Sequence, residues 1–322
     1  MLRLAPPLLI LAALAAAALV TAVALGSVPI APAELAAVLL GGGEELHRTL
    51  VLELRAPRAL AAFAVGGLLA VAGALMQVLL RNPLADPYVL GLSGGAAVGA
   101  LTAMLAGLGM ALVSSAAFAG ALLSTLLVFG LAHGTGSWTP TRLLLTGVVV
   151  ASGWGALVTF MLAVGPTERL PGMLYWLMGD LAYAGSPWAA LITLAAAVVV
   201  AAPLGRSLNV LARGPLQAAT LGVSVRPLEW GIYAAASLLT AVAVTTAGSV
   251  GFVGLVVPHM LRLVLGNDQR LILPAAALAG GALLALADVL ARTLIAPEQL
   301  PVGVITAMLG VPLFLYLLHR TR

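Results

Sequence analysis

Apolar stretches long enough to cross a lipid bilayer recur along the chain, separated by short polar segments. A hydrocarbon core about 30 Å thick needs about 20 apolar residues in a helix. Nine stretches meet or approach that length, and a tenth, at 249–265, is shorter and contains proline, histidine and arginine. The pattern therefore predicts about ten transmembrane helices. The nine clear spans are 8–26, 59–80, 88–108, 110–132, 143–165, 187–205, 230–248, 271–287 and 302–318.

The composition agrees with this pattern and excludes a soluble domain. Hydrophobic residues make up 62% of the 322 residues and charged residues only 8%, whereas about 25% of the residues in a soluble domain are charged. The chain contains no cysteine, which excludes disulfides and thiolate metal sites. We therefore predict an all-α membrane protein in which residues 1–322 form a single transmembrane domain.

The arginines predict how the chain is oriented. All fifteen basic residues are arginine. With ten spans both termini lie on one side, and that side holds ten of the arginines. Because loops rich in basic residues stay in the cytoplasm, we expect both termini to be cytoplasmic. This orientation makes the polar segments 27–57 and 166–186 external and the segment 206–229 cytoplasmic.

The sequence carries no constellation that would support catalysis. There is no GxxxxGK[ST] loop for nucleotide phosphates and no HExxH or similar metal-binding cluster. The four histidines are scattered singly, and no basic run points to nucleic acid. We therefore expect no catalytic residues, no metal site, no cofactor in this chain and no nucleic-acid partner.

A single carboxylate, Asp288, lies within a span, near its end. Arg292 follows four residues later, so the two can pair on one helix face. A structural pair is favoured over a proton or sodium relay, since a relay needs further buried acids. An ion-gradient-driven secondary transporter remains as the alternative function, but the sequence lacks the buried acids expected for it.

The stretch RNPLADP at 81–87 joins two spans on the cytoplasmic side. Its prolines stop the helix, and its Asn and Asp side chains can bond the exposed backbone of a turn. GLSGG follows at 91–95, where small residues allow either close helix packing or broken helix geometry. From physical chemistry alone, the segment is a tight cytoplasmic turn followed by one of these two arrangements.

With these residues, the chain resembles the permeases of type II ABC importers, the family that takes up iron chelates, haem and cobalamin. The resemblance extends over nearly the whole chain after the first span, and its motifs occur in the family's order. They are LRAPRAL at 54–60, GALMQ at 73–77, RNPLADPYVLGLSGGAAVGA at 81–100, RLLLTGV at 142–148, YWLMGDL at 175–181, GSVGFVGLVVPHMLRL at 248–263, LADVLAR at 286–292 and LPVGVITAMLGVPLFLYLL at 300–318.

The resemblance implies a fold of ten transmembrane helices, two copies of which line a path for the substrate. It also implies two ATPase subunits below, which would carry ATP and Mg²⁺, and a periplasmic binding protein above. The expected function is ATP-driven import of cobalamin, haem or a ferric siderophore across a bacterial inner membrane. The motif YWLMGDL gives a slight preference for a tetrapyrrole-like substrate.

The resemblance also assigns roles to individual residues, with two departures. Pro140 stands where the family can have a hydroxyl residue beside the gate position Thr141, and 214–217 is GPLQ, where an acidic residue is often found. The matched positions are Asn82, Leu84 and Thr141 at the cytoplasmic gate; Arg55, Arg58 and Arg292 at the binding-protein docking site; and Leu216, Gln217, Ala219, Leu221, Gly222 and Val223 in the loop that contacts the ATPase.

Overall fold

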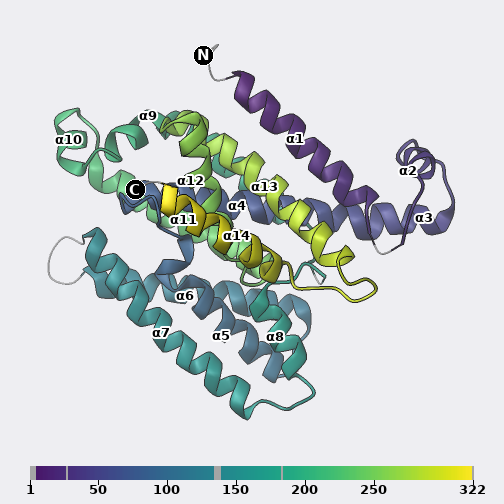
Figure 1. Cartoon of the computed structure of the whole chain (residues 1–322). Coiled ribbons are helices and arrows are strands. Elements are labelled where there is room, and N and C mark those ends of the chain that lie inside the picture. Colours follow the sequence, from purple (N-terminus) through teal and green to yellow (C-terminus); the bar gives the residue numbers. More distant parts are fainter. Residues whose placement is uncertain (1–4, 27, 134–138, 183, 321–322) are drawn as a thin grey trace.

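A computed structural model describes residues 5–26, 28–133, 139–182 and 184–320, and every regular element among them is a helix (Figure 1). The expected all-α fold is confirmed. Ten of the helices are long and apolar. They are α1 (Ala5–Ala24), α4 (Ala56–Leu79), α5 (Leu92–Leu105), α6 (Met110–His133), α7 (Pro140–Val164), α9 (Trp188–Leu211), α11 (Val225–Ala247), α12 (Val253–Leu265), α13 (Gln269–Thr293) and α14 (Val302–Arg320).

These ten helices correspond one for one to the ten predicted spans. Seven are long and apolar enough to cross a bilayer, and α5, α12 and α14 are shorter apolar helices. The short span at 249–265, which was the least regular in sequence, forms α12 despite Pro258 inside it. The chain is therefore a multi-pass membrane protein.

Helix α4 is the centre of the packing, because almost all of its residues are buried. It contacts α13, α11, α12 and α9. Two glycines permit the closest approaches: a Cβ atom at Gly66 would overlap the carbonyl oxygen of Gly280 in α13, and one at Gly73 would overlap that of Gly254 in α12. Small residues let helix backbones approach in lipid, where the hydrophobic effect does not drive helices together.

The two ends of the bundle carry different short helices. In Figure 1, α10 (Pro215–Thr220) and the C-terminal end of α14 lie at the left, whereas α2 (Pro32–Leu39) and α3 (Glu45–Thr49) lie at the right. The left end is the predicted cytoplasmic end and the right end is the predicted external end. The candidate gate and coupling residues belong to the first end, and the candidate docking arginines belong to the second.

Three predicted loops are more ordered than expected. The segment 27–57 contains α2, α3 and a π-helical turn, Leu50–Arg55, that runs directly into α4. The segment 166–186 contains α8 (Leu170–Met178), and the loop 206–229 narrows to 212–224 because α9 and α11 extend into it. The predicted spans were ended at charged residues. An exposed helix can nevertheless continue beyond the membrane, because water solvates its charged side chains there.

Candidate functional site

The turn after α4 holds two of the predicted gate residues. Arg81 adopts a left-handed conformation with φ of 49°, which reverses the chain where the helix ends. The Asn82 side chain then accepts a hydrogen bond from the Leu84 backbone N–H (2.9 Å), as expected for an Asx-type turn. Asn82 and Leu84 are both exposed at the predicted cytoplasmic end. The turn therefore fixes where these two side chains stand relative to the bundle.

The third predicted gate residue, Thr141, is exposed in the first turn of α7. Helix α7 packs against the 3-10 turn Pro87–Leu90 that ends the same connection, and a Cβ at Gly147 would overlap the Val89 carbonyl oxygen. The two predicted parts of the gate are thus joined through α7 and this turn.

Burial raises the pKa of Asp86, at the start of the turn, to about 6. The hydrogen bond that Asp86 accepts from the Tyr88 N–H acts in the opposite direction and lowers this pKa.

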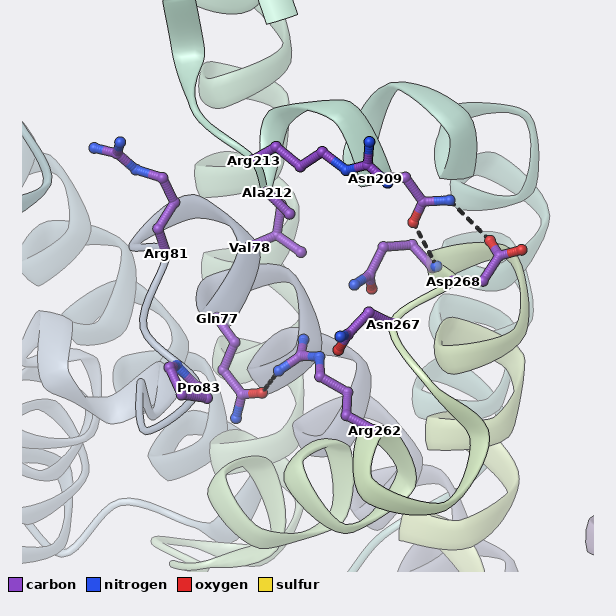
Figure 2. A pocket seen from close by; sticks show the side chains of 11 residues that line it. Gln77, Val78, Arg81, Pro83, Asn209, Ala212, Arg213, Arg262, Asn267 and Asp268 are labelled. Carbon is purple, nitrogen blue, oxygen red and sulfur yellow. Dashed lines mark hydrogen bonds between the residues drawn. The ribbon is translucent and has the colours of Figure 1, made fainter. Parts of the chain in front are cut away.

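A polar pocket of about 600 Å³ lies beside the turn (Figure 2). The ends of α4, α9 and α12 and the start of α13 form its walls. Arg262 donates a hydrogen bond to the Gln77 side chain, and Asn209 donates one to Asp268 (2.8 Å). Hydrogen bonds from Arg270 hold the pKa of Asp268 well below its usual range. Sequence reasoning had not grouped these residues, which come from four separate helix ends.

The predicted ATPase-contacting residues lie on and just after α10. Gly214, with φ of 128°, precedes the helix, and Pro215 occupies its first turn. Ala218 is buried against the bundle, whereas Leu216 and Leu221 are 79% and 70% exposed. Gln217, Ala219 and Gly222 are also exposed, and Val223 is partly buried. The helix thus presents two large apolar side chains outward from the predicted cytoplasmic end.

Two of the predicted docking arginines point into the subunit. Arg55 donates hydrogen bonds to the carbonyl oxygens of Val23, Ala24 (2.9 Å) and Val28, and Arg292 donates to those of Ala22 (3.0 Å) and Leu25 (3.3 Å). Both arginines are buried. They supply donors to carbonyls that lack partners at the end of α1, where a positive charge also complements the helix dipole.

Asp288 is the centre of a buried ionic cluster. The predicted pair with Arg292 is confirmed (2.9 Å), and Arg58 makes a second ion pair with the same carboxylate (2.8 Å). Asp288 is fully buried, and Arg58 also donates to the Gln299 side chain (2.9 Å). Arg55 and Arg58 therefore have different partners: Arg55 bonds to carbonyl oxygens at the end of α1, and Arg58 pairs with Asp288. The docking role of the three arginines stays a prediction.

The family follows from the whole-chain comparison. A family model described as the FecCD transport family matches residues 12–320. The chain belongs to this family. The match covers α1 from residue 12 onward and the other nine long helices in full, and it includes all of the sequence motifs, which lie between residues 54 and 318.

Curated members of the family include cobalamin and haem permeases. The chain is 44% identical over 289 residues to the cobalamin import system permease BtuC of Halobacterium salinarum, covering 88% of this chain and 77% of that one. It is 42% identical over 284 residues to the vitamin B12 import system permease BtuC of Yersinia enterocolitica, covering 86% and 84%. It is 41% identical over 281 residues to the hemin transport system permease HmuU of Yersinia pestis, covering 84% and 83%.

A solved structure agrees with the sequence comparisons. It is described as an inward-facing conformation of a proposed metal-chelate type ABC transporter, and it superposes on this chain with a TM-score of 0.84. The two chains are 28% identical, and the match covers 97% of this chain and 98% of the other. This FecCD family member is therefore an ABC transporter permease, the membrane subunit of its transporter.

Proposed function

We propose that this chain forms the substrate path of an ATP-driven importer for a metal chelate of the cobalamin, haem or ferric-siderophore class. The observation that carries the proposal is a pair of exposed apolar side chains, Leu216 on α10 and Leu221 just after it. Apolar side chains of this size on a short exposed helix favour a protein partner. In an ABC permease that partner is the ATPase, so ATP hydrolysis is assigned to a separate subunit and this chain is not itself an enzyme.

The proposed assembly is a homodimer of this chain with two ATPase subunits and a substrate-binding protein. ATP and Mg²⁺ would bind to the ATPase subunits, and this chain would need no cofactor of its own. The proposed location is the cytoplasmic membrane, with both termini inside and α2 and α3 outside. The relatives named for cobalamin, vitamin B12 and hemin support a tetrapyrrole-like substrate in preference to a siderophore.

Transport in liposomes tests the proposal directly. The complete complex should accumulate cyanocobalamin or hemin only when ATP is supplied on the α10 side, and the purified permease alone should hydrolyse no ATP. A secondary transporter predicts the opposite dependence, in which ionophores that collapse ion gradients stop uptake and ATP has no effect. Uptake by the permease alone, driven by an imposed proton or sodium gradient, would exclude the ATP-driven mechanism.

A further inference from the structure

An apolar groove of about 720 Å³ lies between α9 and α11. One wall runs along α9 from Ala197 to Leu208, and the other runs along α11 from Pro227 to Leu239. The segment 221–224, which follows α10, closes the groove at the predicted cytoplasmic end. The groove therefore ends against the residues that connect α10 to α11.

The length of the groove matches one leaflet of a bilayer. Ala197 and Leu208 are eleven residues apart on one helix, which at about 1.5 Å per residue is about 16 Å. Half of a hydrocarbon core is about 15 Å thick. Because α9 ends and α11 begins at the predicted cytoplasmic end, the groove lies at the depth of the cytoplasmic leaflet. The solvent at that depth is the acyl chains of phospholipids.

Two arginines stand at the predicted cytoplasmic end of the groove. Arg206 precedes the wall residue Ser207 on α9, and Arg226 precedes the wall residue Pro227 on α11. Both are exposed, and neither has an acidic partner in the part of the chain that the structure describes. Glu229, the nearest acid along α11, interacts with Arg81. Basic side chains at this level attract anionic headgroups.

We propose that this groove binds an acyl chain of an anionic phospholipid from the cytoplasmic leaflet, and that its phosphate lies between Arg206 and Arg226. The bound chain would pack against Leu221 and Val223 and hold α10 in position against the ATPase. The orientation and the effect on coupling rest on the proposed function. Lipid binding itself rests on the shape, depth and charge of the groove, so the two can be tested separately.

Gly231 allows the groove to be filled without disturbing the fold. It lines the groove on α11, and a Cβ atom there would have no neighbour within 4 Å. A leucine at this position should occupy the space of the acyl chain. Gly130, near the predicted cytoplasmic end of α6, has the same free space but lies outside the groove. Gly130→Leu is therefore a matched control for the added side chain and for its depth in the membrane.

Native mass spectrometry of the permease, released from nanodiscs that contain phosphatidylglycerol and phosphatidylcholine, measures retained lipid. The unmodified chain and Gly130→Leu should retain phosphatidylglycerol preferentially, and Gly231→Leu should lower its retention about fivefold, the effect of losing about ten atom–atom packing contacts with the acyl chain. The double variant Arg206→Gln, Arg226→Gln should reduce the preference for phosphatidylglycerol by up to about thirtyfold. Equal retention by Gly231→Leu and Gly130→Leu would overturn the site. An unchanged lipid preference in the double variant would overturn the headgroup assignment.

The effect on coupling is measured in the complete complex as substrate transported per ATP hydrolysed. Gly231→Leu should lower this ratio, whereas Gly130→Leu should leave it unchanged. Loss of lipid without a change in the ratio would overturn the role in coupling. If no ATP-driven transport occurs with the unmodified chain, the proposed function fails, but the lipid measurement on the permease alone still decides whether the groove is a lipid site.

Discussion

Replacing Asp288 with asparagine should destabilise the protein by about 3–5 kcal/mol, because it leaves two guanidinium groups without their carboxylate. Asp288 is fully buried, and the side chains of Arg58 and Arg292 are only 14% and 7% exposed. Asparagine has nearly the shape of aspartate, so the exchange changes charge and hydrogen bonding rather than packing. The effect thus reports on the electrostatics of the cluster.

The lower part of this range is the better expectation. Arg58 keeps its hydrogen bond to the Gln299 side chain (2.9 Å), and Arg292 keeps the one to the Ala22 carbonyl oxygen (3.0 Å). The asparagine oxygen can also accept one bond in place of the carboxylate. A loss of about 3 kcal/mol corresponds to a change of more than a hundredfold in the folding equilibrium, which unfolding measurements resolve easily.

Denaturant-induced unfolding in mixed micelles, followed by circular dichroism, provides the assay, and Asp268→Asn provides the control. Asp268 also pairs with an arginine, Arg270 (2.7 Å), but these side chains are 29% and 43% exposed. Exposed ion pairs contribute only about 0.2–1 kcal/mol. If the two variants lose the same amount of stability, burial does not govern the strength of the Asp288 cluster, and the reasoning is refuted.

Three further predictions concern the predicted cytoplasmic end. Leu216→Asp should leave the chain folded but lower ATPase binding and transport. Because Leu216 lies outside the groove between α9 and α11, normal transport would remove α10 from the proposed ATPase contact. Single cysteines at Asn82 or Leu84, introduced into a chain that has none, should cross-link between subunits in some nucleotide states only, and cross-linking independent of nucleotide would leave the turn purely structural. Because the pKa of Asp86 is raised in the native state, the wild type should lose stability as the pH rises from about 4 to about 6. Asp86→Asn lacks this titration, so its unfolding midpoint minus that of the wild type should rise over the same interval and then stay level. A difference that is constant with pH would contradict the assignment.

The spans could be predicted from the sequence because a bilayer imposes a length on every apolar helix. The clearest example is α6, which starts at the residue predicted and ends one residue later. The start of α4 was missed for a related reason. Glu53 and Arg55 interrupt the apolar pattern, yet the helix continues through them, because Glu53 is exposed to water and the buried Arg55 donates hydrogen bonds to carbonyl oxygens at the end of α1.

The site was predicted less completely, because hydropathy and spacing report only on neighbours along one helix. The pair between Asp288 and Arg292 is four residues apart and was found, whereas the pair between Arg58 and Asp288 joins two helices 230 residues apart and was not. The polar pocket at the predicted cytoplasmic end was missed for the same reason. For the hydrogen bonds at the end of α1, the sequence signal was the presence of Arg55 and Arg292 close to the ends of predicted spans. Nothing in the sequence indicates which helix lies next to these two arginines.

Burial of the arginines changes what docking at the external end requires. An acidic side chain of a binding protein would compete for Arg55 and Arg292 with carbonyl oxygens at the end of α1, and for Arg58 with Asp288. A ligand shifts such an equilibrium only by the difference between its affinities for the two states. Arg58 has the more exposed side chain of the two that pair with Asp288, so it can accept an additional acidic partner with the least rearrangement. If the binding protein bound Arg55 and Arg292 instead, these arginines would release the end of α1. Because such coupling is reciprocal, the position of α1 would then change the affinity for the binding protein by the same free energy by which docking shifts α1.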